Sequence, residues 1–220
     1  NLGLRAVYRG APEAQTARAK GSAPNANPNY FRCISAADDN LGRLLKTLDD
    51  LGLTQDTVVV FASDNGYYKG EHGLGDKRSA YEESLRIPLM LRYPKLLPKG
   101  KVVDEMVLNI DLAPTFLDLA GLPVPAQMQG RSWRPLLAGK PAGWRQSFLV
   151  EYFHENQFPT TPTLVAVRTA DAKLVKYPDH DEWTELFDLV QDPYETENLA
   201  ADPARKALLA RMLAELDQQV

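Results

Sequence analysis

Asp64 and Asn65 stand at the carboxyl end of a hydrophobic run, directly before Gly66, and both side chains offer hard oxygen atoms. Open α/β sheets place their ligands at the carboxyl ends of strands. A chain that turns at Gly66 could therefore aim both side chains at one divalent cation. Two oxygens are too few, because Ca²⁺ takes about six to eight ligands and Mg²⁺ about six, so other residues must complete such a site. Asp-Asn-Gly is also favourable turn chemistry, and a simple turn is the alternative interpretation.

Two further polar side chains follow in the same stretch. His72 lies between Gly70 and Gly73 in a polar loop, where it could transfer a proton near neutral pH or be an ordinary loop histidine. Lys77 could stabilise negative charge that develops on a bound anion, or be a surface lysine. Arg86 could belong to a charged surface or to a buried ion pair that fixes the loop. Singly, none of these residues is specific for a function.

The elements around this stretch predict an α/β layer. They are helices over residues 34–51 and 111–120, and strands over residues 57–62 and 88–93. Gly52 and Gly121 are placed to end the helices, and Asp111 to cap the second one. The β-branched run 57–62 favours a strand buried on both faces, as in a parallel sheet covered by helices.

The pattern changes after about residue 139. Short strand-like segments joined by turn-rich links, such as residues 177–181, predict a small antiparallel sheet, with strands over residues 147–153, 164–168, 173–177 and 185–189. A last helix is expected to open at Asp202-Pro203, an N-cap followed by proline. We therefore expect an α/β fold in three parts: a connector over residues 1–30, part of an α/β core over residues 31–138, and an α+β subdomain over residues 139–220.

Composition excludes several classes of protein. A net charge of −4 and the absence of long basic runs argue against nucleic-acid binding. No stretch approaches the roughly 18 apolar residues of a membrane span. The single cysteine, Cys33, excludes an internal disulfide, and we expect it to be buried. The chain starts Asn-Leu-Gly-Leu without a targeting pattern, and we expect it to be part of a longer protein.

As an ordered set, the polar motifs resemble one family. They are Asp64-Asn65-Gly66, Gly70-Glu71-His72-Gly73-Leu74, Asp76-Lys77-Arg78, Tyr81-Glu82-Glu83-Ser84 and Leu85-Arg86-Ile87-Pro88. This order resembles the type I sulfatases of the alkaline-phosphatase-like superfamily. The flanking segments Ser35–Arg43, Asp111–Gly121, Gln129–Ser132, Glu185–Leu189, Asp192-Pro193 and Glu197–Leu199 resemble the same family. The resemblance extends from about residue 30 to the end and implies part of an alkaline-phosphatase-like mixed sheet.

The resemblance also implies a role for each of the polar residues. Asp64 and Asn65 match two ligands of a divalent cation, usually Ca²⁺ with Mg²⁺ possible. Lys77 matches a lysine that neutralises charge on the sulfate, and His72 a histidine that contacts sulfate and helps protonate the leaving alcohol. The implied substrate is a sulfated small molecule or glycan, with most likeness to N-acetylglucosamine-6-sulfatases. By family analogy, the implied location is periplasmic or secreted.

The family's nucleophile is a formylglycine made in a Cys/Ser-x-Pro-Ser-Arg sequence, which this chain does not contain. Cys33 lacks the proline and arginine of that motif, so it is rejected as the nucleophile. We expect the formylglycine in a preceding segment and no turnover by this chain alone.

Two alternatives stay open. One is a non-catalytic sulfated-glycan-binding or structural module. The other is a phosphatase or phosphodiesterase of the same superfamily. The strand at 57–62 is also expected to leave an exposed sheet edge through which the chain could self-associate.

Overall fold

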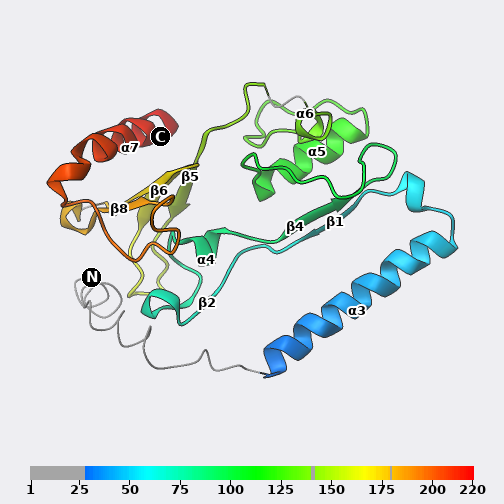
Figure 1. Cartoon of the computed structure of the whole chain (residues 1–220), viewed down its shortest axis with the longest axis horizontal. Helices are drawn as coiled ribbons and strands as arrows, with labels where there is room; N and C mark the ends of the chain where they lie inside the picture. Colours follow the sequence, from blue (N-terminus) through cyan, green and yellow to red (C-terminus); the bar gives the residue numbers. More distant parts are fainter. Residues whose placement is uncertain (1–27, 140–141, 179) are drawn as a thin grey trace. The chain divides into compact units, whose positions relative to one another are not determined.

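The computed structural model describes residues 28–139, 142–178 and 180–220 (Figure 1). These residues form two compact units. Unit 1 contains residues 65–87 and 145–220, and unit 2 contains residues 28–64 and 88–144. Residues 65–87, which the sequence division assigned to the α/β core, thus cluster with the C-terminal part of the chain. Most of the expected connector lies outside the described residues, but its last three residues, 28–30, are already helical.

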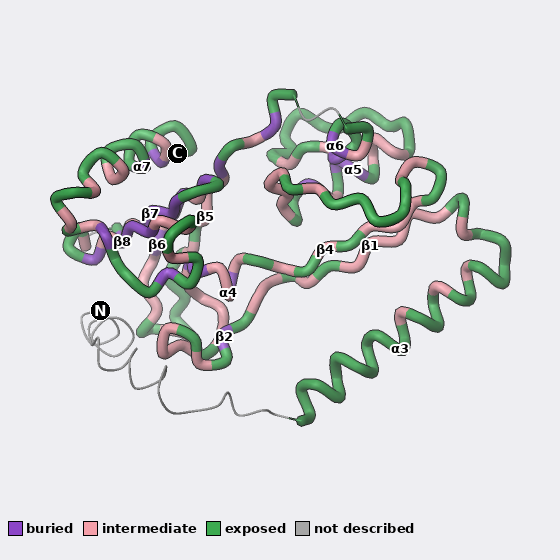
Figure 2. The backbone as a smooth tube through the Cα atoms, viewed as in Figure 1, coloured by how far each residue is buried: buried purple, intermediate pink, exposed green. Residues whose placement is uncertain are grey.

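In unit 2, helix α3 spans Pro28–Asp50 and none of its residues is buried (Figure 2). The helix ends as predicted, because Gly52 has a φ of 69°, a left-handed conformation that glycine adopts without strain. The amide groups of Gly52 and Leu53 donate to the carbonyls of Asp49 and Leu48, which completes a Schellman cap. The prediction that Cys33 is buried is wrong: it lies on the exposed surface of this helix.

A short 3₁₀ turn, Thr54–Asp56, leads into strand β1, Val59–Ala62. Strand β4, Leu89–Arg92, pairs with β1 in an antiparallel register that sets Val60 opposite Leu91. The expected parallel, doubly covered strand is therefore wrong for the described residues, where β1 is half-buried in a two-stranded sheet. A run of β-branched residues indicates a strand but does not determine the direction of its neighbour.

The rest of unit 2 packs helices α5, Leu112–Leu119, and α6, Arg134–Leu137, around a core that includes Trp133 and Trp144. Gly121 again takes a left-handed conformation after α5. Asp111 lies at the N-terminus of α5 but does not cap it through its side chain. It is fully buried, and its carboxylate accepts hydrogen bonds from the amides of Leu108 and Arg131 and from the indole of Trp133.

Unit 1 is built on the predicted antiparallel sheet, which has the order β5-β6-β7-β8. Its strands are β5, Ser147–Tyr152, β6, Leu164–Thr169, β7, Ala172–Lys176, and β8, Glu185–Asp188. The short 3₁₀ helix Asp181–Trp183 lies between β7 and β8. A 3₁₀ turn, Pro203–Arg205, opens helix α7, Lys206–Gln219, and the Asp202 carboxylate accepts from the amide of Ala204 as predicted. Across the described residues, no helix has the length and apolar character to cross a membrane.

The two faces of this sheet have different partners. Val167 and Leu174 pack with Met212 and Leu216 of α7. The alternate residues face the segment 65–87, since successive side chains of a strand point to opposite faces. This segment contains β2, Tyr68–Lys69, the 3₁₀ turn Glu71–Gly73, β3, Gly75–Asp76, and the one-turn helix α4, Glu82–Leu85. The sheet thereby supports the loop that carries three of the four predicted site residues.

Candidate functional site

The structure brings two predicted site residues together in unit 1. The ammonium of Lys77 donates a hydrogen bond to Oδ1 of Asn65, with Nζ and Oδ1 2.5 Å apart. Both side chains are half-buried. Asn65 begins the segment 65–87 and Lys77 follows β3, so this contact closes the loop between them. A single positive charge is thus held in place beside an amide oxygen.

Close packing against α4 fixes the start of this loop. The amide of Gly66 donates to the carbonyl of Ser84 at 2.8 Å, and a Cβ at Gly66 would come within 1.9 Å of the carbonyl oxygen of Glu83. Only glycine permits that approach. The Ser84 hydroxyl in turn bonds the carbonyl of Lys77. Both ends of the loop are therefore tied to α4.

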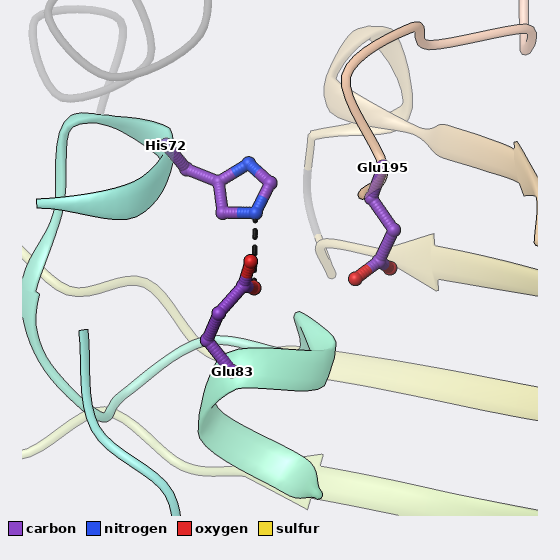
Figure 3. Close-up of side chains that lie close together, drawn as sticks. All are labelled: His72, Glu83 and Glu195. Atoms are coloured by element: carbon purple, nitrogen blue, oxygen red, sulfur yellow. Dashed lines mark hydrogen bonds and ion pairs between the residues drawn. The ribbon is translucent and has the colours of Figure 1, made fainter. Parts of the chain in front are cut away.

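His72 lies against α4 in a buried position (Figure 3). Its Nε2 lies 3.0 Å from Oε2 of Glu83, and its ring stacks on Tyr81 at a centroid distance of 4.2 Å. Burial raises the pKa of Glu83, but the hydrogen bond with His72 and a backbone hydrogen bond outweigh it and hold that pKa below its ordinary value. The side chain of His72 is only 5% exposed, and no hydrogen bond described for it reaches Lys77.

Tyr68 and Tyr81 join the loop to the sheet. The hydroxyl of Tyr68 bonds that of Ser79 at 2.7 Å and accepts from the amide of Tyr81. Burial raises the pKa of Tyr68, so its hydroxyl stays protonated. The hydroxyl of Tyr81 donates to Oε2 of Glu185 at 2.9 Å, and Glu185 is itself fully buried on β8.

A buried ionic network anchors the other side of α4. Lys173 on β7 is fully buried, and its Nζ lies 2.8 Å from Oε1 of Glu82 and 2.8 Å from Oε1 of Glu195. Glu82 also pairs with Arg168, and its amide donates to Oε2 of Glu195. Burial raises the pKa of Glu82, yet Lys173 and Arg168 together hold it below its ordinary value. Burial raises the pKa of Glu195, and Lys173 offsets this only in part.

His72, Glu83 and Glu195 also form a possible metal-ligand group. One ligand atom from each lies within 4.8 Å of the others (Figure 3). The Lys173 ammonium, 2.8 Å from Glu195, already neutralises this carboxylate and would repel a cation. We therefore interpret the group as part of the ionic network.

Sequence reasoning missed this network. Its members outside α4 are Arg168 and Lys173 on the sheet and Glu195 in the turn after β8. Lys173 stands between Ala172 and Leu174 in an apolar run, and a lone charge at an inward strand position was the available signal. Glu195 has a φ of 52°, a left-handed conformation in a turn, and no periodic pattern indicates that such a residue is buried.

Asp64, the other predicted metal ligand, is the last residue of its unit 2 segment and is exposed. The hydroxyl of Ser63 lies 3.5 Å from its Oδ1. The donors fit a hard cation in type, because Asp64 offers a carboxylate and Asn65 an amide oxygen with two lone pairs. They supply only two of the ligands such a cation needs.

Family models match almost the whole chain. Residues 7–122 match the family described as Sulfatase, and residues 70–220 match that described as N-sulphoglucosamine sulphohydrolase, C-terminal. The chain belongs to the sulfatase family. Both family models match residues 70–122, and the motifs from Asp64 to Pro88 lie in that region or just before it.

Individual relatives agree with this assignment. This chain is 40% identical over 201 residues to the N-acetylglucosamine-6-O-sulfatase of Bacteroides thetaiotaomicron, covering 87% of this chain and 35% of that protein. It also resembles the solved structure of BT4656 in complex with its substrate D-glucosamine-2-N,6-O-disulfate, with a TM-score of 0.80 and 35% identity. This match covers 84% of this chain and 38% of that one. A phosphonate monoester hydrolase of Agrobacterium radiobacter matches with a TM-score of 0.74 and 28% identity, covering 84% of this chain and 40% of that one. This chain thus spans well under half the length of these relatives.

Proposed function

We propose that this chain contributes part of the cation and sulfate site of an enzyme that hydrolyses sulfate esters on glycans. The observation that carries the proposal is the 2.5 Å contact between Lys77 and Asn65 within the family's ordered motif. The contact supports a fixed positive charge next to a predicted ligand of the cation. Relatives named for action on N-acetylglucosamine and a relative bound to a sulfated glucosamine support an amino-sugar sulfate as substrate.

The chemistry follows from these side chains. Asp64 and Asn65 would help to hold the cation, Ca²⁺ or Mg²⁺, which when bound polarises the sulfate ester. The Lys77 ammonium would stabilise the negative charge that develops on the sulfate oxygens. His72 as an acid for the leaving alcohol stays a prediction. Its contacts with Glu83 and Tyr81 support a second role, in which it fixes the shape of the loop between Asn65 and Lys77.

The nucleophile is the part of the reaction that this chain does not provide. We propose that a formylglycine-bearing segment of the same enzyme supplies it, in a periplasmic or secreted setting by analogy with the family. The test joins such a segment to this chain and measures hydrolysis of N-acetylglucosamine 6-sulfate and of an aryl sulfate. Turnover of both with a requirement for a divalent cation is expected. Binding of the sugar sulfate without hydrolysis would instead favour a non-catalytic glycan-binding module.

A phosphoryl-transfer enzyme is the second candidate, since the match to a phosphonate monoester hydrolase favours it. An aryl phosphate and an aryl phosphonate in the same assay separate the two. The sulfatase proposal expects the aryl sulfate to be hydrolysed with the larger kcat/KM, and the reverse order would contradict it.

The edges of the β1–β4 sheet offer a surface for association between copies of this chain. Size-exclusion chromatography over a range of concentrations tests this part of the proposal. A single monomer peak at every concentration would contradict it.

A further inference from the structure

Ser84 reaches both sides of the candidate site. It is a residue of the one-turn helix α4 and is only 5% exposed. Its hydroxyl donates a hydrogen bond to the backbone carbonyl of Lys77. Its own carbonyl accepts a hydrogen bond from the amide of Gly66 at 2.8 Å, and Gly66 directly follows Asn65 in the chain. Ser84 is therefore bonded to Lys77 and to the neighbour of Asn65.

These contacts form a closed ring. Lys77 and Asn65 are twelve positions apart, and the Lys77 ammonium donates to Oδ1 of Asn65 at 2.5 Å. Asn65 continues into Gly66, and the hydrogen bonds of Gly66 and Lys77 with Ser84 complete the ring. A lysine side chain is flexible, so one contact at its tip leaves its backbone free to move. The hydroxyl of Ser84 restrains that backbone.

Ser84 can serve as a fixed point because its neighbours in α4 are anchored. Oε1 of Glu82 lies 2.8 Å from the ammonium of the buried Lys173 on β7. Oε2 of Glu83 lies 3.0 Å from Nε2 of His72. A single helical turn has little stability of its own, so contacts of this kind determine where the Ser84 hydroxyl lies.

The backbone conformation beside Lys77 also requires support. Asp76, the preceding residue, has a φ of 70°, a left-handed conformation that an L-residue keeps only when surrounding contacts impose it. The ion pair of Asp76 with Arg78 is one such contact. The hydrogen bond from Ser84 to the Lys77 carbonyl is another. The turn that carries Lys77 is thus supported on both sides.

We propose that Ser84 is the positioning residue for Lys77. Its hydroxyl fixes the backbone of Lys77 and thereby the ammonium beside Asn65. Donors that are in place before a reaction stabilise developing charge without reorganisation, so this restraint raises the rate. The effect on the rate rests on the proposed function, whereas the restraint itself does not. Ser84 acts through Lys77 and needs no contact with the substrate.

The side-chain amide of Asn65 reports the restraint in the 220-residue chain without any substrate. Lys77→Ala removes the ammonium, and its NMR spectrum gives the Asn65 side-chain resonances in the absence of the contact. Ser84→Ala is expected to move these resonances about half or more of the way to those positions, because the population in contact falls. Ser84→Cys keeps the shape but is a weak donor, so a smaller movement in the same direction is expected. Unmoved resonances in both Ser84 variants would overturn the proposal.

Ser147→Ala is the matched control. Ser147 on β5 is 7% exposed, and its hydroxyl donates to Glu215 on α7 instead of to the loop. This variant also loses a buried hydroxyl, yet it should leave the Asn65 resonances at their parent positions. An equal movement in Ser147→Ala and Ser84→Ala would mean that the loss of any buried hydroxyl disturbs the contact, and the positioning role would be wrong.

Kinetics of the joined enzyme separate positioning from a general structural role. Ser84→Ala is expected to lower kcat about tenfold and to change KM less than about twofold, because Lys77 acts on the transition state. In an enzyme that already carries Lys77→Ala, the same substitution should lower kcat less than about threefold, since the group that it positions is gone. An equal loss in the two backgrounds would overturn the proposal.

The two measurements distinguish this proposal from the proposed function. A joined parent enzyme that hydrolyses no sulfate ester would reject the sulfatase proposal, and the Asn65 resonances would still test the restraint by Ser84. Unmoved resonances together with an active parent enzyme would reject the positioning role alone.

Discussion

Lys173 and Glu195 form a fully buried ion pair, with Nζ and Oε1 2.8 Å apart, under the helix that supports the candidate site. Glu82, the first residue of that helix, completes the group at the same distance from Lys173. Buried charges persist in proteins only when they are paired. The network therefore couples the stability of the sheet to the position of α4.

Replacement of Lys173 by methionine is expected to be strongly destabilising. Lys173→Met leaves Glu82 and Glu195 without their shared partner, and breaking a buried pair in this way costs about 3–5 kcal/mol of unfolding free energy. Urea unfolding followed by circular dichroism measures the loss. The matched control is Lys176→Met on the same strand, whose pair with the exposed Asp181 contributes about 0–1 kcal/mol. Equal losses in the two variants would contradict the importance of the network.

Gly66→Ala tests the close approach of the loop to α4. The new Cβ would meet the backbone carbonyl of Glu83, and overpacking against a rigid group costs about 1–3 kcal/mol. Thermal unfolding should show a lower Tm than that of the parent chain. Gly75→Ala is the control, because no atom lies within 4 Å of its added Cβ. A Tm for Gly66→Ala as high as that of the control would show that the loop adapts without cost.

The contact between His72 and Glu83 predicts a specific pH dependence. The folded-state pKa of Glu83 is lowered, so its contribution to stability is present above the ordinary value of about 4.5 and is lost as the pH falls through the folded-state value. Glu83→Gln removes this contribution. The difference in unfolding free energy between parent and variant should therefore be largest above pH 4.5 and become smaller as the pH falls below it.

Denaturant titrations at several pH values measure this difference. Glu197→Gln, at an exposed position, is the control and should change the free energy by less than about 0.5 kcal/mol. A difference in unfolding free energy between the parent and Glu83→Gln that stays constant with pH would show that the ionisation of Glu83 does not contribute to stability.

Lys77→Ala tests the candidate site in the enzyme formed by joining this chain to a formylglycine-bearing segment. Loss of a charge that stabilises the transition state should raise the activation free energy by about 3 kcal/mol. The value of kcat/KM should therefore fall roughly a hundredfold. Lys69→Ala, at an exposed lysine in the same loop, serves as the comparison. Similar kcat/KM values for the parent and Lys77→Ala would show that Lys77 does not stabilise the transition state.

The 220-residue chain alone is expected to show no sulfate-ester hydrolysis, since its sequence lacks the formylglycine motif. Sensitive fluorogenic aryl sulfates provide the measurement, with the joined enzyme as the positive control. Turnover by the purified chain would mean that another residue acts as nucleophile.

Much of the fold could be predicted where a local pattern determines the outcome. The strands of the C-terminal sheet follow from short strand-like segments between turn-rich links, and Gly52 and Gly121 end helices because they take left-handed conformations. The family motif predicts a common site for Asn65 and Lys77, which stays a prediction, and the structure shows that the two side chains are in contact. Predictions that depended on distant partners were wrong: the direction of the neighbour of β1 and the burial of Cys33.

The supporting network could not be predicted for a related reason. In the sequence, Glu82 has the pattern of a common helix glutamate and Lys173 that of a common strand lysine. Only the fold shows that the two side chains form an ion pair. Asp111 has the local sequence of a helix cap, but its carboxylate instead accepts from the amide of Arg131, far along the chain. Long-range pairing of polar groups leaves no periodic signal.

The segment 65–87 is anchored by contacts that span long stretches of chain: Tyr81 to Glu185 over 104 positions, and Glu82 to Glu195 over 113. Contacts of this sequence separation form slowly, because a long loop must close before they provide any stabilisation. During synthesis, the loop bearing Lys77 leaves the ribosome well before β7, β8 and Glu195 exist. The segment 65–87 can therefore take up its final arrangement only after the residues up to Glu195 have been synthesised.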